Sequence, residues 1–374
     1  MNVHIIAPVL PPALNGIGDY TAQLAAEVAG SHKITLLTGL DQTPQQIPGV
    51  TIKNLFSVDD RPSIKHVAQY VIDECPDWVL LQYNPFAYGK WGLNLDLPAA
   101  MQKIKKASPK TKFALMVHEP FVPILDIKHA VMTTWQRWQL LRLGQLADLV
   151  FFSIDPWARK FRKWYPGKPL VHLPVSSNIP LVAGSRDAVR SQLGISPETL
   201  VLGYFGTFHN FRMPHWVRDA ARHVAPSGEN ALILYVGPHT EAVTQSLGNF
   251  PTISEGRLSA EDVSLRLRAM DIYLAPFLDG VSTRRTSLIS ALQHGVPTVG
   301  TKGYHTDEML SREDGKSLLL ADVNDQQDFN KQVARLANDA ALRETLSCNA
   351  RTFFDDNFTW PRIASRMITS FESI

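Results

Sequence analysis

Short apolar segments alternate with longer segments of helical periodicity along the whole chain, and this alternation constrains the fold most. In the first half, strands are expected at 3–8, 33–37, 78–82, 112–117 and 149–153, and helices at 20–29, 64–73 and 131–146. Strands that are apolar on both faces and separated by helices indicate a parallel sheet covered on both sides. Because crossover connections are right-handed, a doubly wound sheet is the simplest topology.

The same alternation starts again near residue 200. Strands are expected at 200–205, 231–236, 272–275, 298–300 and 317–320, and helices at 260–269, 286–294 and 326–336. Between the halves lies LVHLPVSSNIPLVAGS (170–185), which is rich in Pro and Ser and has no helical period. A chain of 374 residues is long enough for two hydrophobic cores, so we expect two α/β domains joined by this linker.

Composition excludes several classes of protein. A formal net charge of +2 argues against a protein whose whole surface binds nucleic acid. Cys75 and Cys348 lie far apart and outside any metal-ligand spacing, which favours reduced thiols in a cytoplasmic protein. No run of 18 apolar residues occurs, and the start, MNVHIIAPVLPP, is expected to be a buried first strand instead of a signal peptide.

In open α/β sheets, ligands bind beyond the carboxyl ends of the strands, so the residues that follow each strand are candidates for function. Gly16 and Gly18 lead into the first helix, where glycines and a helix N-terminus can bind an anion; a tight turn explains them equally well. His118 follows the fourth expected strand and could donate a hydrogen bond to a ligand, or could be structural.

The second half offers arginines at similar places. Gly206 follows its first strand, and Arg212 lies near the next helix, where a guanidinium can bind a diphosphate or can simply be solvated. The loop LDGVS, with Asp279, precedes a helix that opens with Arg284 and Arg285. Two arginines at a helix N-terminus oppose the macrodipole, so we expect an anion beside them, and phosphate is the natural candidate. The alternative is that both point to solvent.

These segments resemble the retaining GT-B glycosyltransferases of family four. The resemblance rests on APFLDGVSTRRTSLISALQHGVPTVGTKGYHTDE, preceded by AMDIYLAP and followed by DGKSLLLADVND, on NFTWPRIASRMITSF at the C-terminus, and on NGIGDYTAQLA, MVHE and ADLVFFS in the first half. It implies two Rossmann-like domains facing a central cleft: an acceptor-side domain at 1–175, a donor domain at 185–355, and a C-terminal helix at 356–374 that returns to the first domain.

The resemblance also implies residue roles. Gly16 would lie near the donor diphosphate, His118 would orient the donor sugar, Arg212 would bind phosphate, and Glu308 would lie near the helix by the donor. The loop residues Asp279, Gly280 and Val281 belong to the same donor-binding stretch, and the nucleotide base would be bound near Gly256 and Arg257.

Three positions depart from the family pattern. Ser282 and Ser290 stand where the family has two glutamates spaced E-x7-E, and Thr207 stands where it has a diphosphate-binding arginine. A neutral serine would bind a ribose hydroxyl more weakly than a charged group. The pair Arg284–Arg285 would supply the missing positive charge. A subgroup of the family carries similar GVS.RR.SL and QYNP..YG stretches; QYNPFAYG at 82–89 includes Asn84, which we therefore add to the candidate binding residues.

The implied function is metal-independent, retaining transfer of a hexosyl group from a nucleotide-diphosphate sugar to a glycan or lipid-linked acceptor, as in polysaccharide biosynthesis. The phosphate of the leaving nucleoside diphosphate would accept the proton of the acceptor hydroxyl, and no cofactor would be needed. Three alternatives stay open: a nucleotide-sugar epimerase, a phosphorylase on the same fold, and a weakened, non-catalytic module that binds nucleotide sugars or acts as a scaffold.

One basic segment bears on location. ARKFRKWYPGK (158–168) interleaves lysines and arginines with Phe161, Trp164 and Tyr165. Basic and aromatic side chains together suit an anionic membrane surface, so peripheral contact with the inner face of a membrane is one interpretation. A solvated helix face is the other.

Overall fold

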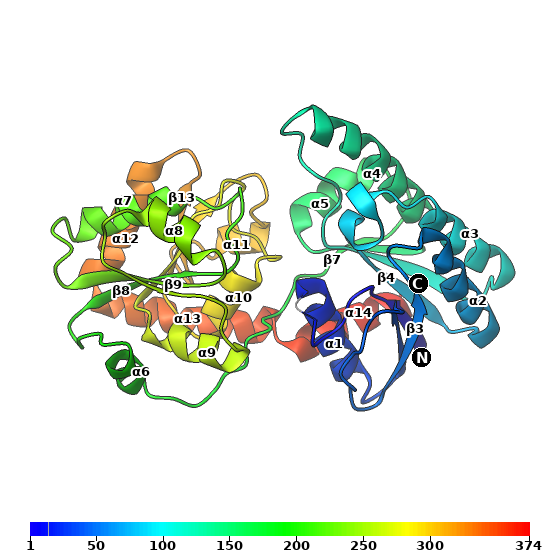
Figure 1. Cartoon of the computed structure of the whole chain (residues 1–374), viewed down its shortest axis with the longest axis horizontal. Coiled ribbons are helices and arrows are strands. Elements are labelled where there is room, and N and C mark those ends of the chain that lie inside the picture. Colours follow the sequence, from blue (N-terminus) through cyan, green and yellow to red (C-terminus); the bar gives the residue numbers. More distant parts are fainter. Residues whose placement is uncertain (14) are drawn as a thin grey trace. The chain divides into compact units, whose positions relative to one another are not determined.

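The chain folds into two compact units in the computed structural model, which describes residues 1–13 and 15–374 (Figure 1). Unit 1 comprises Met1–Pro174 and Trp360–Ile374, and unit 2 comprises Val175–Thr359. The sequence had predicted domains at 1–175 and 185–355 and a returning helix at 356–374.

Unit 1 is built on seven parallel strands in the order β3-β2-β1-β4-β5-β6-β7. These are β1 (Asn2–Ile6), β2 (Lys33–Gly39), β3 (Val50–Phe56), β4 (Trp78–Tyr83), β5 (Lys112–Val117), β6 (Leu149–Phe152) and β7 (Leu170–His172). The helices are α1 (Gly16–Val28), α2 (Ile64–Glu74), α3 (Asp96–Ala107), α4 (Ile127–Leu146), α5 (Asp155–Lys160) and α14 (Trp360–Glu372). Short 3-10 turns are η1 (Arg61–Ser63), η2 (Pro85–Ala87), η3 (Lys90–Gly92) and η4 (Phe161–Lys163).

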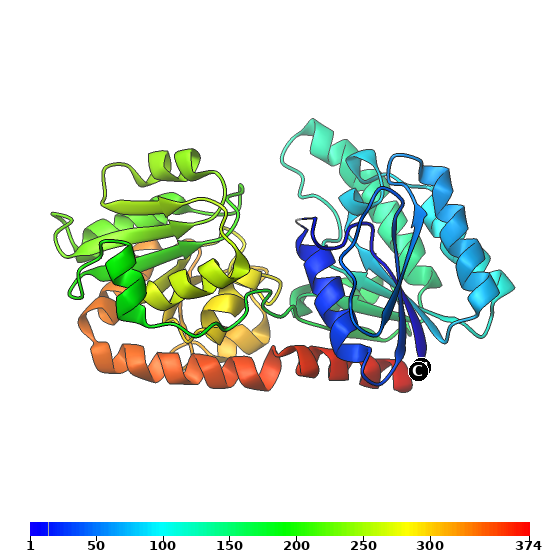
Figure 2. The same cartoon turned by 60° about the horizontal axis from the view of Figure 1, so that its bottom comes forward.

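The C-terminal helix α14 is part of the core of unit 1. It contacts α1, and both views show the two helices beside each other (Figure 1, Figure 2). Phe371 stacks on Trp78 of β4 with ring centroids 4.3 Å apart. Four side chains of α14 are buried: Ile363, Ala364, Met367 and Phe371. The last residues of the chain therefore help to stabilise its first domain.

Unit 2 has six parallel strands in the order β10-β9-β8-β11-β12-β13. They are β8 (Leu200–Phe205), β9 (Ala231–Val236), β10 (Thr252–Glu255), β11 (Ile272–Ala275), β12 (Thr298–Lys302) and β13 (Leu319–Asp322). The helices are α6 (Arg186–Gln192), α7 (Pro214–Val224), α8 (Thr240–Leu247), α9 (Ala260–Ala269), α10 (Thr286–Gln293), α11 (Glu308–Arg312), α12 (Gln326–Asn338) and α13 (Ala340–Asn357).

The predicted fold class, two doubly wound parallel sheets, is confirmed. The order of strands reverses between β1 and β4 in unit 1 and between β8 and β11 in unit 2, so each sheet has a switch point of the kind that binds ligands. The central strands are buried along nearly their whole length, as their apolar sequences predicted. The predicted linker at 170–185 was wrong at its start, because Leu170–His172 pairs with β6 as strand β7.

Candidate functional site

The candidate site lies in unit 2, where the loops after β8 and β11 meet at the switch point of the sheet. Backbone contacts hold these loops together: Leu278 N donates to Phe211 O over 2.8 Å, and Met213 N donates to Pro276 O over 3.1 Å. Arg212 and Phe277 form an antiparallel bridge. This pairing carries Arg212, from the first loop, to the start of α10, which follows the second loop.

Arg212 is buried, with 7% of its surface exposed. Its Nη2 donates to Ser287 Oγ over 3.2 Å, and its guanidinium carbon lies 4.8 Å from the ring of Phe277 and 5.1 Å from that of Tyr204. Among the described residues, its Nε and Nη1 have no hydrogen-bond partner. A buried guanidinium with unsatisfied donors is costly unless an acceptor joins it.

Gly206 makes room for this arginine. Its φ of +115° is open to glycine and strained for other residues, and a β-carbon there would lie 2.4 Å from Arg212 Nη2. Gly206 N donates to Val236 O over 2.9 Å, which fixes the turn to the end of β9. The sequence predicted Gly206 near the ligand; the structure shows that it touches the arginine.

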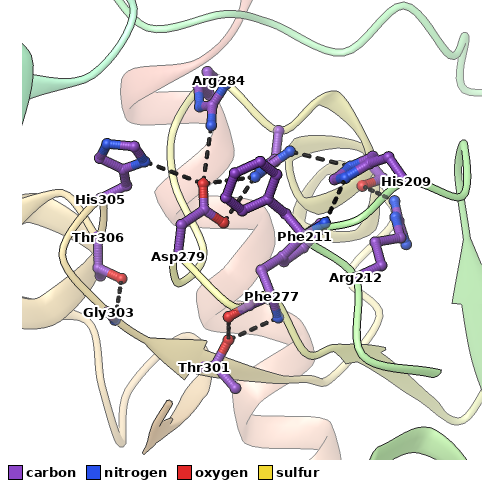
Figure 3. Close-up of polar contacts among 12 residues, drawn as sticks. His209, Phe211, Arg212, Phe277, Asp279, Arg284, Thr301, Gly303, His305 and Thr306 are labelled. Atoms are coloured by element: carbon purple, nitrogen blue, oxygen red, sulfur yellow. Dashed lines mark hydrogen bonds and ion pairs between the residues drawn. The ribbon is translucent and has the colours of Figure 1, made fainter. Parts of the chain in front are cut away.

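Asp279 forms the centre of a charged cluster. Its carboxylate is fully buried and accepts hydrogen bonds from Arg285 Nη2 at 2.8 Å and from Arg284 Nη2 at 2.9 Å, and His305 Nδ1 lies 3.1 Å away (Figure 3). Arg285 also stacks on Phe277, with 4.5 Å between its guanidinium carbon and the ring centroid. Figure 3 shows Arg284 and His305 pointing to the same carboxylate from different loops.

This cluster corrects one step of the sequence argument. We expected the anion beside Arg284 and Arg285 to be a bound phosphate, but the chain itself places Asp279 there. The pair also precedes the helix, because α10 begins at Thr286 and Arg285 is its N-cap residue. Arg212, Arg284, Arg285 and Asp279 still carry a formal charge of +2 together.

Burial and charge shift the titration of this cluster. Burial raises the pKa of Asp279, but the hydrogen bond from His305 and the charges of Arg285 and Arg284 outweigh it and hold the pKa well below its usual range. Burial, aided by Arg285 and Arg212, lowers the pKa of His209 to about 3. Burial also lowers the pKa of His305, against the opposing hydrogen bond to Asp279. The imidazole of His209 is therefore neutral near pH 7.

The other predicted loop residues hold the loop in place. Gly280 has φ +86°, and a β-carbon there would lie 2.4 Å from Gly303 N, so the loops after β11 and β12 touch backbone to backbone. Val281 is fully buried and its N donates to Thr301 O over 2.8 Å. Ser282 is fully buried, and its Oγ has no hydrogen-bond partner among the described residues.

Three further predicted residues lie in different surroundings. Ser290 is fully buried in α10, and its Oγ contacts Ser177 Oγ and Thr286 O, each at 2.8 Å. Glu308 is the first residue of α11 and pairs with Arg312. Arg257 is exposed in the loop between β10 and α9.

In unit 1, the predicted residues follow β1, β4 and β5. Asn15 caps α1 by accepting from Gly18 N over 3.0 Å, and a β-carbon on Gly18 would lie 2.5 Å from Val9 O, so close packing requires this glycine. Around Gly16, by contrast, a β-carbon would meet open space. Asn84 Oδ1 accepts from Phe86 N over 3.0 Å and caps η2.

His118 is buried at the end of β5. Its Nε2 lies 2.7 Å from Gln82 Oε1, and its ring packs edge-on against Tyr20 at 5.1 Å. Burial lowers its pKa to about 3, so the ring is neutral near pH 7. A neutral imidazole held this way can donate or accept one hydrogen bond but cannot supply a fixed charge.

The aromatic part of the membrane interpretation of 158–168 is wrong. Phe161 and Tyr165 are 1% exposed, and Tyr165 OH donates to Leu140 O over 2.8 Å, so these rings belong to the core of unit 1. The basic side chains Arg159, Lys160, Arg162 and Lys163 are exposed, whereas Lys168 is half-buried and donates to Ala147 O. Within residues 1–13 and 15–374, no helix is long and apolar enough to span a bilayer.

Sequence reasoning missed His209, His305, Ser287 and Phe277. His209 Nε2 lies 3.2 Å from Arg285 Nη1, and Phe277 is contacted by both Arg212 and Arg285. The two histidines follow β8 and β12, so the strand-end criterion used for His118 would have selected them. Over the same described ranges, no group of three or more His, Cys, Asp or Glu side chains could hold a metal ion.

Comparisons with known proteins agree with this architecture. Residues 199–339 match the family described as glycosyl transferases group 1, and no curated protein matches the chain. Sucrose-phosphate synthase from Thermosynechococcus elongatus has a TM-score of 0.78 at 16% identity, over 100% of this chain and 98% of that chain. Anabaena HepE, in complex with UDP and glucose, gives 0.73 at 15% identity over 100% of both chains.

WaaG, a glycosyltransferase involved in lipopolysaccharide biosynthesis, gives a TM-score of 0.71 at 16% identity over 98% of this chain and 99% of that chain. At such identities, structural likeness establishes the fold. The chain has a fold of the GT-B type, in which two Rossmann-like units are joined in one polypeptide.

Proposed function

We propose that the protein transfers a sugar from a nucleotide-diphosphate sugar to an acceptor, with the diphosphate bound in unit 2. The buried guanidinium of Arg212 carries the proposal: two of its nitrogens have no protein partner in the described chain, and it lies beside the start of α10. A phosphate oxygen would satisfy these donors, and the N-terminus of a helix favours an anion.

The comparisons support the same class of donor. The matched family covers 199–339, which includes Gly206, Arg212, Asp279, Arg284 and Arg285. Structures of HepE are described as complexes with UDP and with UDP-glucose. A uridine diphosphate sugar is therefore the first donor to test, and a hexosyl group is the first sugar.

The proposed chemistry uses charge already in place. As the bond between the sugar and the diphosphate breaks, negative charge grows on the leaving phosphate, and Arg212, Arg284 and Arg285 would stabilise it without reorganisation. We propose that transfer retains the configuration of the sugar, requires no metal, and uses the leaving phosphate to accept the acceptor's proton. His118 would orient the sugar through a hydrogen bond.

The acceptor proposed is a glycan or a lipid-linked molecule, and the place of action is the cytoplasm, either in solution or at the inner face of a membrane. Release of nucleoside diphosphate from a panel of donors would identify the sugar. Mass spectrometry of the product would then identify the acceptor.

Calorimetry with nucleoside diphosphates tests the site. Arg212→Gln should lower the affinity at least tenfold, because charge-assisted hydrogen bonds to phosphate are lost. Arg222→Gln is the matched control, because Arg222 is an exposed arginine of α7 in the same unit. Equal affinities of the two variants for every diphosphate would exclude the proposed site.

One observation favours the binding-module alternative. The resemblance puts Ser282 and Ser290 in the places of the family's two glutamates, and the Ser290 hydroxyl contacts Ser177 and Thr286 O inside the unit. A protein that binds the donor without turnover would fit this arrangement. Binding of a diphosphate with no sugar transfer to any acceptor, and no donor hydrolysis, would favour the module over the enzyme.

A further inference from the structure

Unit 1 exposes a cluster of large apolar side chains on the first part of α4 and on the segments 86–95 and 124–125. The cluster, here called the α4 patch, comprises Phe86, Trp91, Leu95, Ile124, Leu125, Ile127, Val131 and Trp138. It holds eight of the thirteen exposed large apolar residues of the described chain, so these side chains are concentrated instead of scattered. Ile127 is the most exposed, at 84%. Such concentrations mark interaction surfaces.

The two segments that make the patch are in contact. Trp135 Nε1 and Gln136 Nε2, both from α4, donate to Trp91 O over 3.1 and 3.0 Å. On α4, Ile127, Val131 and Trp138 lie at helical spacing on one face. The first turns of α4 extend past the sheet of unit 1 in both views (Figure 1, Figure 2).

The chain holds Trp91 outward at a conformational cost. Its φ is +58° and ψ is +18°, a left-handed conformation that is rare for a bulky residue, yet its side chain is 55% exposed. Gly92 follows it with φ +73°, and a β-carbon there would lie 2.5 Å from Gln136 Nε2. Strained residues persist where the surroundings fix them, often at ligand-binding surfaces.

Cations accompany the aromatic rings of this region. Lys90 and Lys128 lie 5.9 and 6.0 Å from the ring centroid of Trp91, and Arg137 and Lys160 lie 4.8 and 6.0 Å from that of Phe121. Of the acids near these rings, Asp126 caps α4 and bonds to His129, and the exposed Asp96 directly follows Leu95. A second copy of the chain, docked by two-fold symmetry, would place like charges together, which is unfavourable.

We propose that the α4 patch docks unit 1 on an anionic bilayer. The aliphatic side chains of Ile124, Leu125 and Ile127 would enter the acyl boundary, Trp91 would lie at the headgroups, and the flanking cations would attract anionic lipid. This surface differs from the 158–168 segment, whose rings Phe161 and Tyr165 are buried; of that segment, Lys160 contributes its charge. The proposal gives a surface to the membrane location named under the proposed function, and it does not depend on the diphosphate site in unit 2.

Co-sedimentation with vesicles tests it on the full chain. The wild type should bind vesicles of phosphatidylcholine with phosphatidylglycerol more strongly than vesicles of phosphatidylcholine alone. Leu125→Ser with Ile127→Ser should lower the partition coefficient at least about tenfold, because two aliphatic side chains no longer leave water. Leu40→Ser is the matched control: Leu40 is 54% exposed in unit 1 and lies outside the patch.

A second variant separates charge from apolar contact. Lys90→Gln with Lys128→Gln should lower binding to the anionic vesicles roughly tenfold and reduce the preference for them.

Retained binding in the apolar double variant, or absence of wild-type binding to either vesicle, would overturn the proposal. Light scattering without lipid gives a further test. If the wild type is a dimer and the apolar double variant is a monomer, a second copy covers the patch, and the proposal is overturned. Calorimetry with nucleoside diphosphates reports separately on unit 2.

Discussion

Single residues of unit 2 show how the charges of the site are balanced within the chain. Asp279 stands between Arg284, Arg285 and His305, and its carboxylate has no exposed surface. Removal of one partner from a buried charged group leaves the others uncompensated, which costs more than the intact arrangement contributes. Asp279 therefore positions both arginines and lowers the net charge that a diphosphate would meet.

We expect Asp279→Asn to lower the free energy of unfolding by about 3 kcal/mol, because two guanidinium groups lose their counterion. Pyrophosphate should raise the melting temperature of this variant more than that of the wild type, since it can replace the lost negative charge. Asp219→Asn is the control: Asp219 pairs with Arg218 at the surface, where ion pairs contribute little. An equal pyrophosphate effect in Asp279→Asn and wild type would contradict this role.

His4 gives a prediction about pH. It is fully buried in β1, its two ring nitrogens have no hydrogen-bond partner among the described residues, and burial together with the charge of Lys33 lowers its pKa to about 4. In the unfolded chain its pKa is about 6.5. Between these values the unfolded chain binds the extra proton, so stability is complete above pH 6.5 and decreases as the pH falls toward 4.

In the wild type, protonation of His4 in the unfolded chain should lower the free energy of unfolding by about 2 kcal/mol as the pH falls from 7 to 5. His4→Leu should remove that part of the decrease and leave the part due to other buried histidines. Urea unfolding at the two pH values measures both. The same decrease in variant and wild type would show that His4 is not the group that titrates.

The sequence located Arg212, Arg284 and Arg285 but not the role of Asp279, and the reason is geometric. The three arginines could be found because they follow strands whose carboxyl ends share one edge of a sheet. The ion pairs of Arg284 and Arg285 with Asp279 depend on how the loop after β11 turns back at Gly280. No local sequence pattern predicts that turn. Asp279 was selected as a loop residue, without its partners.

At the scale of elements, local signals sufficed for central strands and failed at three of the four sheet edges; the edge strand β13 was predicted two residues too early. β8, β9 and β11 have the predicted bounds, because they are apolar on both faces. The strands that were missed, β3, β7 and β10, each lie at the edge of a sheet. β10 (TISE) contains no fully buried residue and β7 has three residues, so neither presents the continuous apolar run that marks a covered strand.

The turn after β8 can be tested with paired glycine substitutions. Gly206→Ala adds a β-carbon 2.4 Å from Arg212 Nη2 at φ +115°, so we expect about 1–3 kcal/mol of destabilisation and at least tenfold weaker binding of nucleoside diphosphate. Gly194→Ala has φ +69° but meets nothing within 4 Å, so it should cost about 1 kcal/mol and leave binding unchanged. Unchanged affinity in Gly206→Ala would show that the position of Arg212 does not control binding.

At the scale of the whole molecule, the chain passes from one unit to the other twice, after Pro174 and after Thr359. Unit 2 is continuous, whereas unit 1 takes its last helix from the far end of the sequence. Phe371 packs against both Trp78 at 4.3 Å and Phe151 at 5.9 Å, so α14 covers strands that lie more than 200 residues earlier. The resemblance of the C-terminal segment to a known helix predicted its existence; its packing partners could come only from the folded chain.

Because α14 belongs to unit 1, damage to it should destabilise that unit and leave unit 2 intact. Phe371→Ala removes a side chain that is 1% exposed, and loss of a large core side chain typically costs about 3–5 kcal/mol. We therefore expect urea unfolding to become biphasic, with an early transition from unit 1. The second transition should respond to pyrophosphate, because the proposed diphosphate site lies wholly in unit 2. Glu372→Ala, at an exposed neighbouring position, should leave the unfolding curve unchanged. If Phe371→Ala instead shifted one single transition, the two units would unfold together, and their stabilities would be coupled.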